Sequence, residues 1–286
     1  MKHSIQELRK IAEKIRYRIV RNSYFSGTPH LGSCLSCVDL LVTLYWNILE
    51  IDPNNPSSKF RDRFILSKGH AAPALFQILG ERGFFLLSKL ENYGKNGSIF
   101  GEHPPAPKYL SGIEAATGSL GHGLPMGLGM ALAAKINKLA YQVFVIVSDG
   151  ECNEGSIWEA AMLASAKRAS NLTVFIDYNK WQATGRSKEI LKIDPLIDKW
   201  TSFGWHAVEI DGHNMEEIYN STKEKNRIPD KPFVAIAHTT KGKGVSFMED
   251  DNNWHYRIPN LEEVEAAARE LNIKETNLEN RRILRH

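Results

Sequence analysis

The stretch Val143–Gly185, VFVIVSDGECNEGSIWEAAMLASAKRASNLTVFIDYNKWQATG, decides the fold. It contains two short apolar runs, Val143–Val147 and Leu172–Ile176, and each run ends in polar residues that carry side-chain oxygens. A stretch with helical character lies between them. Strand, helix and strand in this order predict two parallel strands joined by a helical crossover.

The same alternation continues outside this stretch. Further apolar runs at His206–Ile210 and Phe233–Ala237 are expected to be strands, and Arg63–Leu66 has the pattern of a short buried strand. Because we find no repeat, low-complexity segment or clear linker, the sequence predicts an α/β fold: a parallel sheet flanked by helices, in one domain over residues 1–286. Helices are expected from a capping box at Ser4–Glu7 onward, at Val38–Leu49, at Met130–Lys138 and at Leu261–Leu271.

Composition excludes several classes of function. The 36 Lys and Arg residues nearly balance the 33 Asp and Glu residues, so neither nucleic acid nor an anionic membrane is indicated as a partner. No apolar run reaches the roughly 18 residues of a membrane-spanning helix, and the charged start does not resemble a signal peptide. Three cysteines are too few for a disulfide framework, which favours the cytoplasm. Cys34 and Cys37 form C-x-x-C, which we interpret as buried small residues rather than a zinc or redox site.

Two polar residues at the strand ends suggest a cation site. Asp149 and Asn179 each follow a predicted strand, and ligands of open parallel sheets bind beyond the carboxyl ends of the strands. Their oxygens suit Mg²⁺ or Ca²⁺, and Mg²⁺ normally completes its shell with water and phosphate oxygens, which points to a bound diphosphate. Gly150 would let the backbone approach that phosphate, and a helix starting near Gly155 would direct its positive end there. The alternative is that both side chains only cap turns.

The wider pattern resembles one family. Asp149–Gly155 (DGECNEG) and Asn179–Trp181 (NKW) are similar to the thiamine diphosphate signature of a Gly-Asp-Gly followed about thirty residues later by an Asn. Other motifs occur in the order found in transketolases, over nearly all of the chain but only the N-terminal half of such an enzyme. They are Ser26–Gly32 (SGTPHLG), Arg61–His70 (RDRFILSKGH), Gly101–Pro104 (GEHP), Thr117–Gly123 (TGSLGHG), Lys241–Gly244 (KGKG) and Trp254–His255.

The resemblance implies three sets of site residues. The metal ligands would be Asp149, Asn179 and the backbone carbonyl of Trp181. Thiamine diphosphate would contact His70, Gly118, Leu120, Gly150 and His255. The catalytic histidines, facing the reacting carbon and the sugar, would be His30, His103 and His255. For each single histidine the alternative is a solvated or structurally bonded side chain.

Other positions are less clear from the resemblance. Glu154, assigned to the cofactor side, and Glu159 match acidic residues near a dimer interface; salt bridges at a helix start are the alternative. His122 could contact the cofactor or only pack against the backbone. Three residues depart from the family pattern: Ser148 and Tyr256 stand where glycine is usual, and Trp181 is bulky where only a carbonyl is required. Tyr256 suggests an unusual donor or acceptor.

The resemblance also implies a partner. In transketolases the glutamate that activates the cofactor and the arginines that hold a sugar phosphate lie in a pyrimidine-binding domain, which we do not expect within these 286 residues. We therefore expect the N-terminal subunit of a split transketolase, inactive alone, with thiamine diphosphate and Mg²⁺ (or Ca²⁺), in a heterotetramer with a separate C-terminal subunit. It would transfer a two-carbon ketol unit from a ketose or its phosphate to an aldose.

Three other functions remain open. The nearest is a deoxyxylulose-phosphate-synthase-like thiamine enzyme that uses pyruvate. A non-catalytic assembly partner would use only the fold. A nucleotide-binding enzyme is the weakest alternative, because the glycines at 117–129 do not form G-x-G-x-x-G after a convincing strand and no phosphate-binding G-x-x-x-x-G-K-[ST] occurs.

Overall fold

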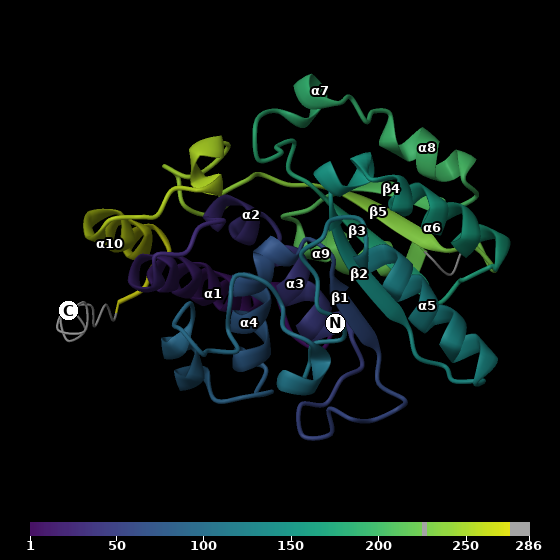
Figure 1. Ribbon diagram of the computed structural model, residues 1–286, viewed down its shortest axis with the longest axis horizontal. Coiled ribbons are helices and arrows are strands. Elements are labelled where there is room, and N and C mark those ends of the chain that lie inside the picture. Colours follow the sequence, from purple (N-terminus) through teal and green to yellow (C-terminus); the bar gives the residue numbers. More distant parts are fainter. Residues whose placement is uncertain (225–227, 275–286) are drawn as a thin grey trace.

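The computed structural model describes residues 1–224 and 228–274 (Figure 1). Within them, one sheet of five strands has the order β1-β2-β3-β5-β4, and every neighbouring pair is parallel. The prediction of a parallel α/β sheet is confirmed. The strands are β1 (Arg63–Leu66), β2 (Val143–Ser148), β3 (Leu172–Tyr178), β4 (His206–Asp211) and β5 (Phe233–His238).

Each of the four longer strands runs past its apolar residues. β2 pairs Ser148 with Asp177 of β3, and β3 pairs Tyr178 with His238 of β5. The ladder continues because backbone hydrogen bonds do not depend on side-chain polarity as long as a neighbour is present. Polar side chains are thereby fixed at the carboxyl end of a rigid sheet.

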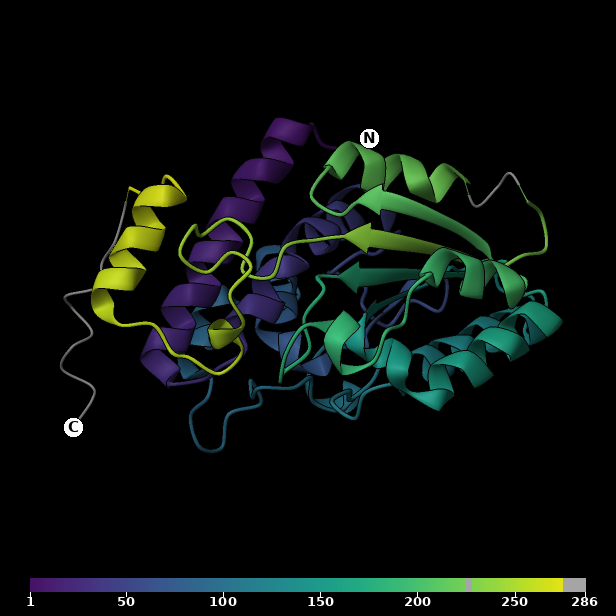
Figure 2. The same ribbon diagram turned by 90° about the horizontal axis from the view of Figure 1, so that it is seen from above.

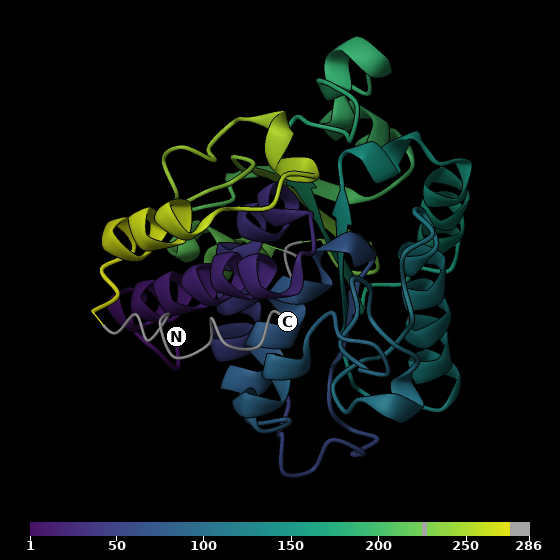
Figure 3. The same ribbon diagram turned by 60° about the vertical axis from the view of Figure 1, so that its left-hand side comes forward.

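Helices cover both faces of the sheet, which explains why the inner strands β2, β3 and β5 are nearly continuous apolar runs, whereas the edge strand β4 is only partly buried. Val145 of β2 faces one layer, and Phe144 and Ile146 face the other. Figures 1 and 3 show the two layers on opposite sides of the sheet. One layer contains α5 (Gly123–Ile136), α6 (Gly155–Ala166) and α8 (Leu196–Ser202). The other contains α1 (Ile5–Ser26), α3 (Val38–Thr43), α4 (Ala72–Glu81) and α9 (Met215–Glu224).

The ends of the main N- and C-terminal helices follow the sequence signals. Helix α1 begins with the predicted capping box: the Glu7 amide donates to Ser4 Oγ at 3.3 Å, and the Ser4 amide donates to Glu7 Oε2 at 2.7 Å. It ends at Gly27, whose φ of 70° is left-handed. Helix α10 (Leu261–Glu270) packs alongside α1 (Figure 2).

Two predicted helices differ from the structure. The helix expected at Met130–Lys138 begins seven residues earlier, at Gly123, inside the glycine series. Glycine is needed there because α5 lies flat on the sheet: a Cβ on Gly127 would come within 2.6 Å of Val145 Cγ2. The helix expected at Val38–Leu49 is α3 followed by one π-helical segment, Leu44–Ile48.

The described residues contain no helix with both the length and the apolar character that crossing a membrane requires. Cys34, Cys37 and Cys152 are all buried and unbridged, and Cys34 and Cys37 pack in the core as expected of small apolar residues.

Candidate active site at the carboxyl ends of the strands

Asp149 and Asn179 lie next to each other in the fold because β2 and β3 are neighbours. Asp149 accepts from the Gly150 amide at 3.0 Å and from Ser187 Oγ at 2.7 Å. Asn179 Oδ1 accepts from the Trp181 amide at 3.0 Å. Both side chains therefore make the turn-capping hydrogen bonds of the alternative interpretation, and a second property is needed to separate it from a cation site.

That property is the burial of an unpaired carboxylate. The Asp149 side chain is fully buried, and among the described residues no basic side chain forms an ion pair with it. Burial raises the pKa of Asp149 to about 6, because the charged form has lost its water. A hard carboxylate beside an amide oxygen, with Lys68 and Lys241 acting on it only at a distance, fits a divalent cation such as Mg²⁺.

Four histidines gather beside these strand ends. The ring of His30 lies among the other three: its centroid is 5.1 Å from that of His255, 5.6 Å from that of His70 and 6.4 Å from that of His103. The four come from four separate motifs of the chain, so the fold brings together all histidines that the resemblance singled out except His122.

Backbone geometry positions His30. It precedes α2 (Leu31–Ser36) in the left-handed region, with a φ of 75°, and its amide donates to the His255 carbonyl at 2.8 Å. Its Nδ1 is buried and makes no hydrogen bond with any residue that the structure describes, and a carboxylate oxygen of Glu102 lies 3.8 Å away. An unusual backbone conformation and an unused polar atom at one residue indicate a site built for a ligand.

Lys241 completes the cluster, and sequence reasoning assigned it no role although its KGKG motif contributed to the resemblance. Its side chain is fully buried; Nζ donates to Asn252 Oδ1 at 2.6 Å and lies 3.2 Å from His255 Nδ1. Burial, together with the charge of Lys68, lowers the pKa of Lys241 to about 8. A positive group among neutral imidazoles is suited to an anion.

The glycine series lies against the histidines. Gly118 has a φ of 155°, and a Cβ there would meet His103 Cδ2 at 2.8 Å, so the His103 ring covers this glycine. Leu120 is partly exposed, and its carbonyl is 3.0 Å from Nδ1 of the exposed His122 ring. His122 thus contacts its own loop. Glu154 is exposed, and its Cβ lies 2.6 Å from the place of a Cβ on Gly121.

A buried ion pair is connected to Asn179 through the hydroxyl of Ser36. The Lys68 ammonium and the Asp177 carboxylate are fully buried and in contact, and Ser36 Oγ donates to the same carboxylate at 2.6 Å. Asn179 Nδ2 donates to that hydroxyl at 3.4 Å. Sequence reasoning missed this network; its one local signal is an aspartate in an otherwise apolar strand.

The three departures from the family pattern have distinct surroundings. Ser148 bonds Glu151 through its amide and its hydroxyl. Trp181 donates to Asp250 at 2.8 Å, and the Arg186 guanidinium stacks on its indole 3.7 Å from the ring centre, so the bulky side chain points into a packed surface cluster. Tyr256 is 63% exposed while its ring centroid is 4.7 Å from that of His255, which puts it at the rim of the cluster.

The histidine cluster gives a prediction for pH. Burial, reinforced by the nearby Lys241, lowers the pKa of His30 to about 4 and that of His255 to about 3. The unfolded chain binds these protons near pH 6.5 and the folded chain does not. The free energy of unfolding therefore falls by about 2 kcal/mol per histidine when the pH is lowered from 7 to 5. Urea unfolding should show this loss, and His255→Asn should reduce it, whereas His122→Asn should not. An equal slope in all three proteins would contradict the prediction.

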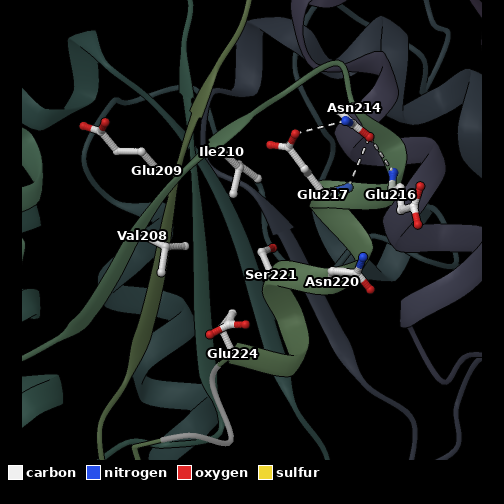
Figure 4. A pocket seen from close by; sticks show the side chains of 9 residues that line it. All are labelled: Val208, Glu209, Ile210, Asn214, Glu216, Glu217, Asn220, Ser221 and Glu224. Carbon is white, nitrogen blue, oxygen red and sulfur yellow. Dashed lines mark hydrogen bonds between the residues drawn. The ribbon is translucent and has the colours of Figure 1, made fainter.

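One groove lies outside this cluster, and several of its polar side chains make the hydrogen bonds that begin a helix. It lies between β4 and α9 and contains none of the site residues predicted from the sequence (Figure 4). Asn214 Oδ1 caps α9 by accepting from the backbone amides of Glu216 and Glu217 at 3.1 and 3.2 Å. Its side-chain Nδ2 donates to Glu217 Oε1 at 3.0 Å. In the described ranges no three His, Cys, Asp or Glu side chains form a metal-binding group.

Comparison with known proteins agrees with this geometry. The family model described as transketolase, thiamine diphosphate binding domain, matches residues 8–279. The chain belongs to the transketolase family. This confirms three predictions made from the sequence: the family, the fold, and the enzyme class, which is a transferase of the transketolase type.

Two relatives are similar over nearly their full length. An apulose-4-phosphate transketolase subunit of Phocaeicola vulgatus is 40% identical over 96% of this chain and 97% of its own. The 6-deoxy-6-sulfo-D-fructose transketolase subunit SqwG of a Clostridium species is 41% identical over 86% of this chain and 89% of its own. The solved transketolase of Campylobacter jejuni superposes with a TM-score of 0.89 at 28% identity, covering 94% of this chain but 43% of the transketolase. The chain thus spans less than half of that transketolase.

Proposed function

We propose that this chain binds thiamine diphosphate and Mg²⁺ and, with a separate second chain, transfers a two-carbon ketol unit from a ketose or ketose phosphate to an aldose. The observation that supports this most is the buried Asp149, which forms no ion pair with a described residue, near the histidine cluster and the buried Lys241. Such a cluster reduces the stability of the fold, so a role in binding explains it better than a role in packing.

The metal and the diphosphate have matching residues. Asp149, Asn179 and the Trp181 carbonyl would hold Mg²⁺, and the cation would neutralise the carboxylate whose pKa burial has raised. Lys241 and the imidazole N–H groups of His70 and His255 would donate to diphosphate oxygens. Gln182 supports the same interpretation, because its buried Nε2 has no hydrogen-bond partner in the described part of the chain and its side chain lies against Gly150.

The histidines would handle protons. When bound, thiamine diphosphate supplies the electron sink that carbon–carbon cleavage needs. His30 and His255 are neutral at pH 7 since burial lowers the pKa of each, so each ring can offer one N–H and one acceptor nitrogen to a hydroxyl or carbonyl of the sugar. His103, on an exposed loop over Gly118, would close the sugar side, with Leu120 and Glu154 on the cofactor side.

A second chain would supply the opposite wall of the pocket. Relatives that match over nearly their full length are named as subunits of a transketolase, which supports a separate partner. We propose a heterotetramer with two sites at shared interfaces, in which residues 1–286 act as one diphosphate-binding domain. The cytoplasmic location and the use of Ca²⁺ in place of Mg²⁺ stay predictions.

Two alternatives make different predictions. A deoxyxylulose-phosphate-synthase-like enzyme would use pyruvate as donor. A pure assembly partner would have no use for a buried carboxylate with a raised pKa at Asp149 or for the lowered histidine pKa values, and is disfavoured for that reason.

Reconstitution tests the proposal. The purified chain should be inactive alone, and adding the second subunit with thiamine diphosphate and Mg²⁺ should create ketol transfer to an aldose acceptor. A donor panel of ketoses, ketose phosphates and pyruvate, followed by product analysis, identifies the reaction. Turnover of pyruvate in place of ketoses would support the synthase-like alternative, and full activity of the single chain would overturn the two-chain proposal.

A further inference from the structure

Glu151 is a buried carboxylate that is not among the proposed metal ligands or cofactor contacts. Its side chain is fully buried next to the end of β2, and both carboxylate oxygens accept hydrogen bonds. Oε1 accepts from Ser67 Oγ at 2.5 Å and from the Gly121 amide at 3.0 Å. Oε2 accepts from the Ser148 amide at 2.9 Å.

These donors come from three segments of the chain. Ser67 follows β1, Ser148 ends β2, and Gly121 belongs to the glycine loop, defined as residues 117–123. Ser67 Oγ also accepts from the Gly123 amide at 3.1 Å, so the loop is attached at two of its glycines. One carboxylate therefore connects the glycine loop with the ends of two strands.

We propose that Glu151 is a positioning residue that orders the glycine loop before the cofactor binds. The inference rests on the proposed function in one respect, namely that the loop carries Gly118 and Leu120 to the cofactor. Gly118 and Gly121 have φ angles of 155° and 81°, so the loop adopts conformations that a free glycine-rich segment would populate only part of the time. A loop ordered in advance does not have to be ordered by the ligand, and the affinity is higher.

The substitution Glu151→Gln isolates the carboxylate with almost no change of volume. An amide has one acceptor oxygen in place of two. If that oxygen faces Ser67 and Gly121, the NH₂ group meets the Ser148 N–H; if it is turned round, the Gly121 N–H loses its acceptor. Either way a buried N–H is left without a partner. The first orientation breaks the connection to the end of β2 at Ser148 and the second breaks the attachment at Gly121, so the link between the loop and β2 is weakened in both.

The matched control is Glu114→Gln. Glu114 is also mostly buried and is paired with Arg61 and Arg63, but it has no hydrogen bond to the glycine loop among the described contacts. It therefore reports the general cost of neutralising a buried carboxylate. Ser67→Ala is a milder second variant, because it keeps the carboxylate and removes the hydroxyl that lies between it and Gly123.

The experiment compares two readouts on the full chain: the dissociation constant of thiamine diphosphate at saturating Mg²⁺, by calorimetry, and hydrogen exchange of peptides that cover residues 117–123. We expect Glu151→Gln to weaken binding at least 10-fold and to lose exchange protection in the glycine loop but not in β3. Ser67→Ala should shift both in the same direction by about 3-fold, and Glu114→Gln should leave both within 2-fold. If Glu151→Gln does not fold, Ser67→Ala decides the question.

Unchanged affinity and loop protection in Glu151→Gln or Ser67→Ala would overturn the proposal, as would a loss of protection spread evenly over the sheet. Failure of the proposed function is recognised separately, because the wild-type chain would then not bind thiamine diphosphate at all, while exchange of the loop would still test its attachment to Glu151.

Discussion

Replacing Asp149 by alanine is expected to weaken binding of thiamine diphosphate with Mg²⁺ by more than about 100-fold, and to lower the activity of the assembled enzyme by at least as much. Loss of residues that only support metal ligands typically costs about 10- to 100-fold in affinity or activity, and loss of a ligand should exceed that. The fold itself should survive, because burial has raised the pKa of this carboxylate to about 6 and its charge is a cost to the empty protein.

Thermal unfolding with and without the cofactor measures both effects. The Asp149→Ala protein should unfold near the wild-type temperature when empty and gain nothing from thiamine diphosphate plus Mg²⁺, whereas the wild type should be stabilised. Asp211→Ala is the matched control, since Asp211 ends β4 of the same sheet but is exposed. Cofactor-dependent stabilisation that persists in Asp149→Ala would rule out its role as a ligand.

The largest effect on stability is expected from Lys68→Met. Burial opposes the charge on both Lys68 and Asp177, yet their attraction prevails: it raises the pKa of the lysine and lowers that of the aspartate. Removing the lysine leaves a carboxylate at 0% exposure with Ser36 and Thr239 as its remaining side-chain donors among the described residues. Breaking a buried pair in this way typically costs about 3–5 kcal/mol.

Equilibrium unfolding in urea tests this, and Lys68→Met/Asp177→Asn is the control. Because the double variant leaves no unpaired charge at this buried position, its free energy of unfolding should be at least about 1 kcal/mol higher than that of Lys68→Met. A loss below about 1 kcal/mol in Lys68→Met would mean that water or another cation reaches Asp177 and that the pair does not support the strand ends.

The inner strands β2, β3 and β5 were predictable because burial on both faces makes each a nearly continuous apolar run, which can be recognised without knowledge of its neighbours. The start of α5 was not, since Gly123 and Gly127 indicate a loop by local rules. They are helical because Gly123 packs closely against Ser67, which follows β1, and Gly127 against Val145 of β2. Local signals also located Asp149 and Asn179 at strand ends. Local signals could not distinguish a turn cap from a cation ligand. That distinction depends on whether the carboxylate is buried and whether a basic side chain forms an ion pair with it.

The rest of the site depends on contacts between distant segments. His30, His70, His103 and His255 come together only in the folded chain, and motif resemblance, not periodicity, singled them out. Lys241, on a loop, and Glu151, in a short 3-10 helix after β2, are charged residues and are ordinarily expected to be solvated. Their burial follows from partners such as Asn252 and Gly121, which no pattern within a short window reveals.

Calorimetric titration of the wild-type chain, without its partner, tests the central claim most directly. The proposed site binds the diphosphate through a cation, so thiamine diphosphate should bind at one site per chain when Mg²⁺ is present. Thiamine, which lacks the diphosphate, should not bind measurably, and chelation of the metal should abolish the heat. Equal binding of thiamine, or no binding of thiamine diphosphate with Mg²⁺ in excess, would contradict it.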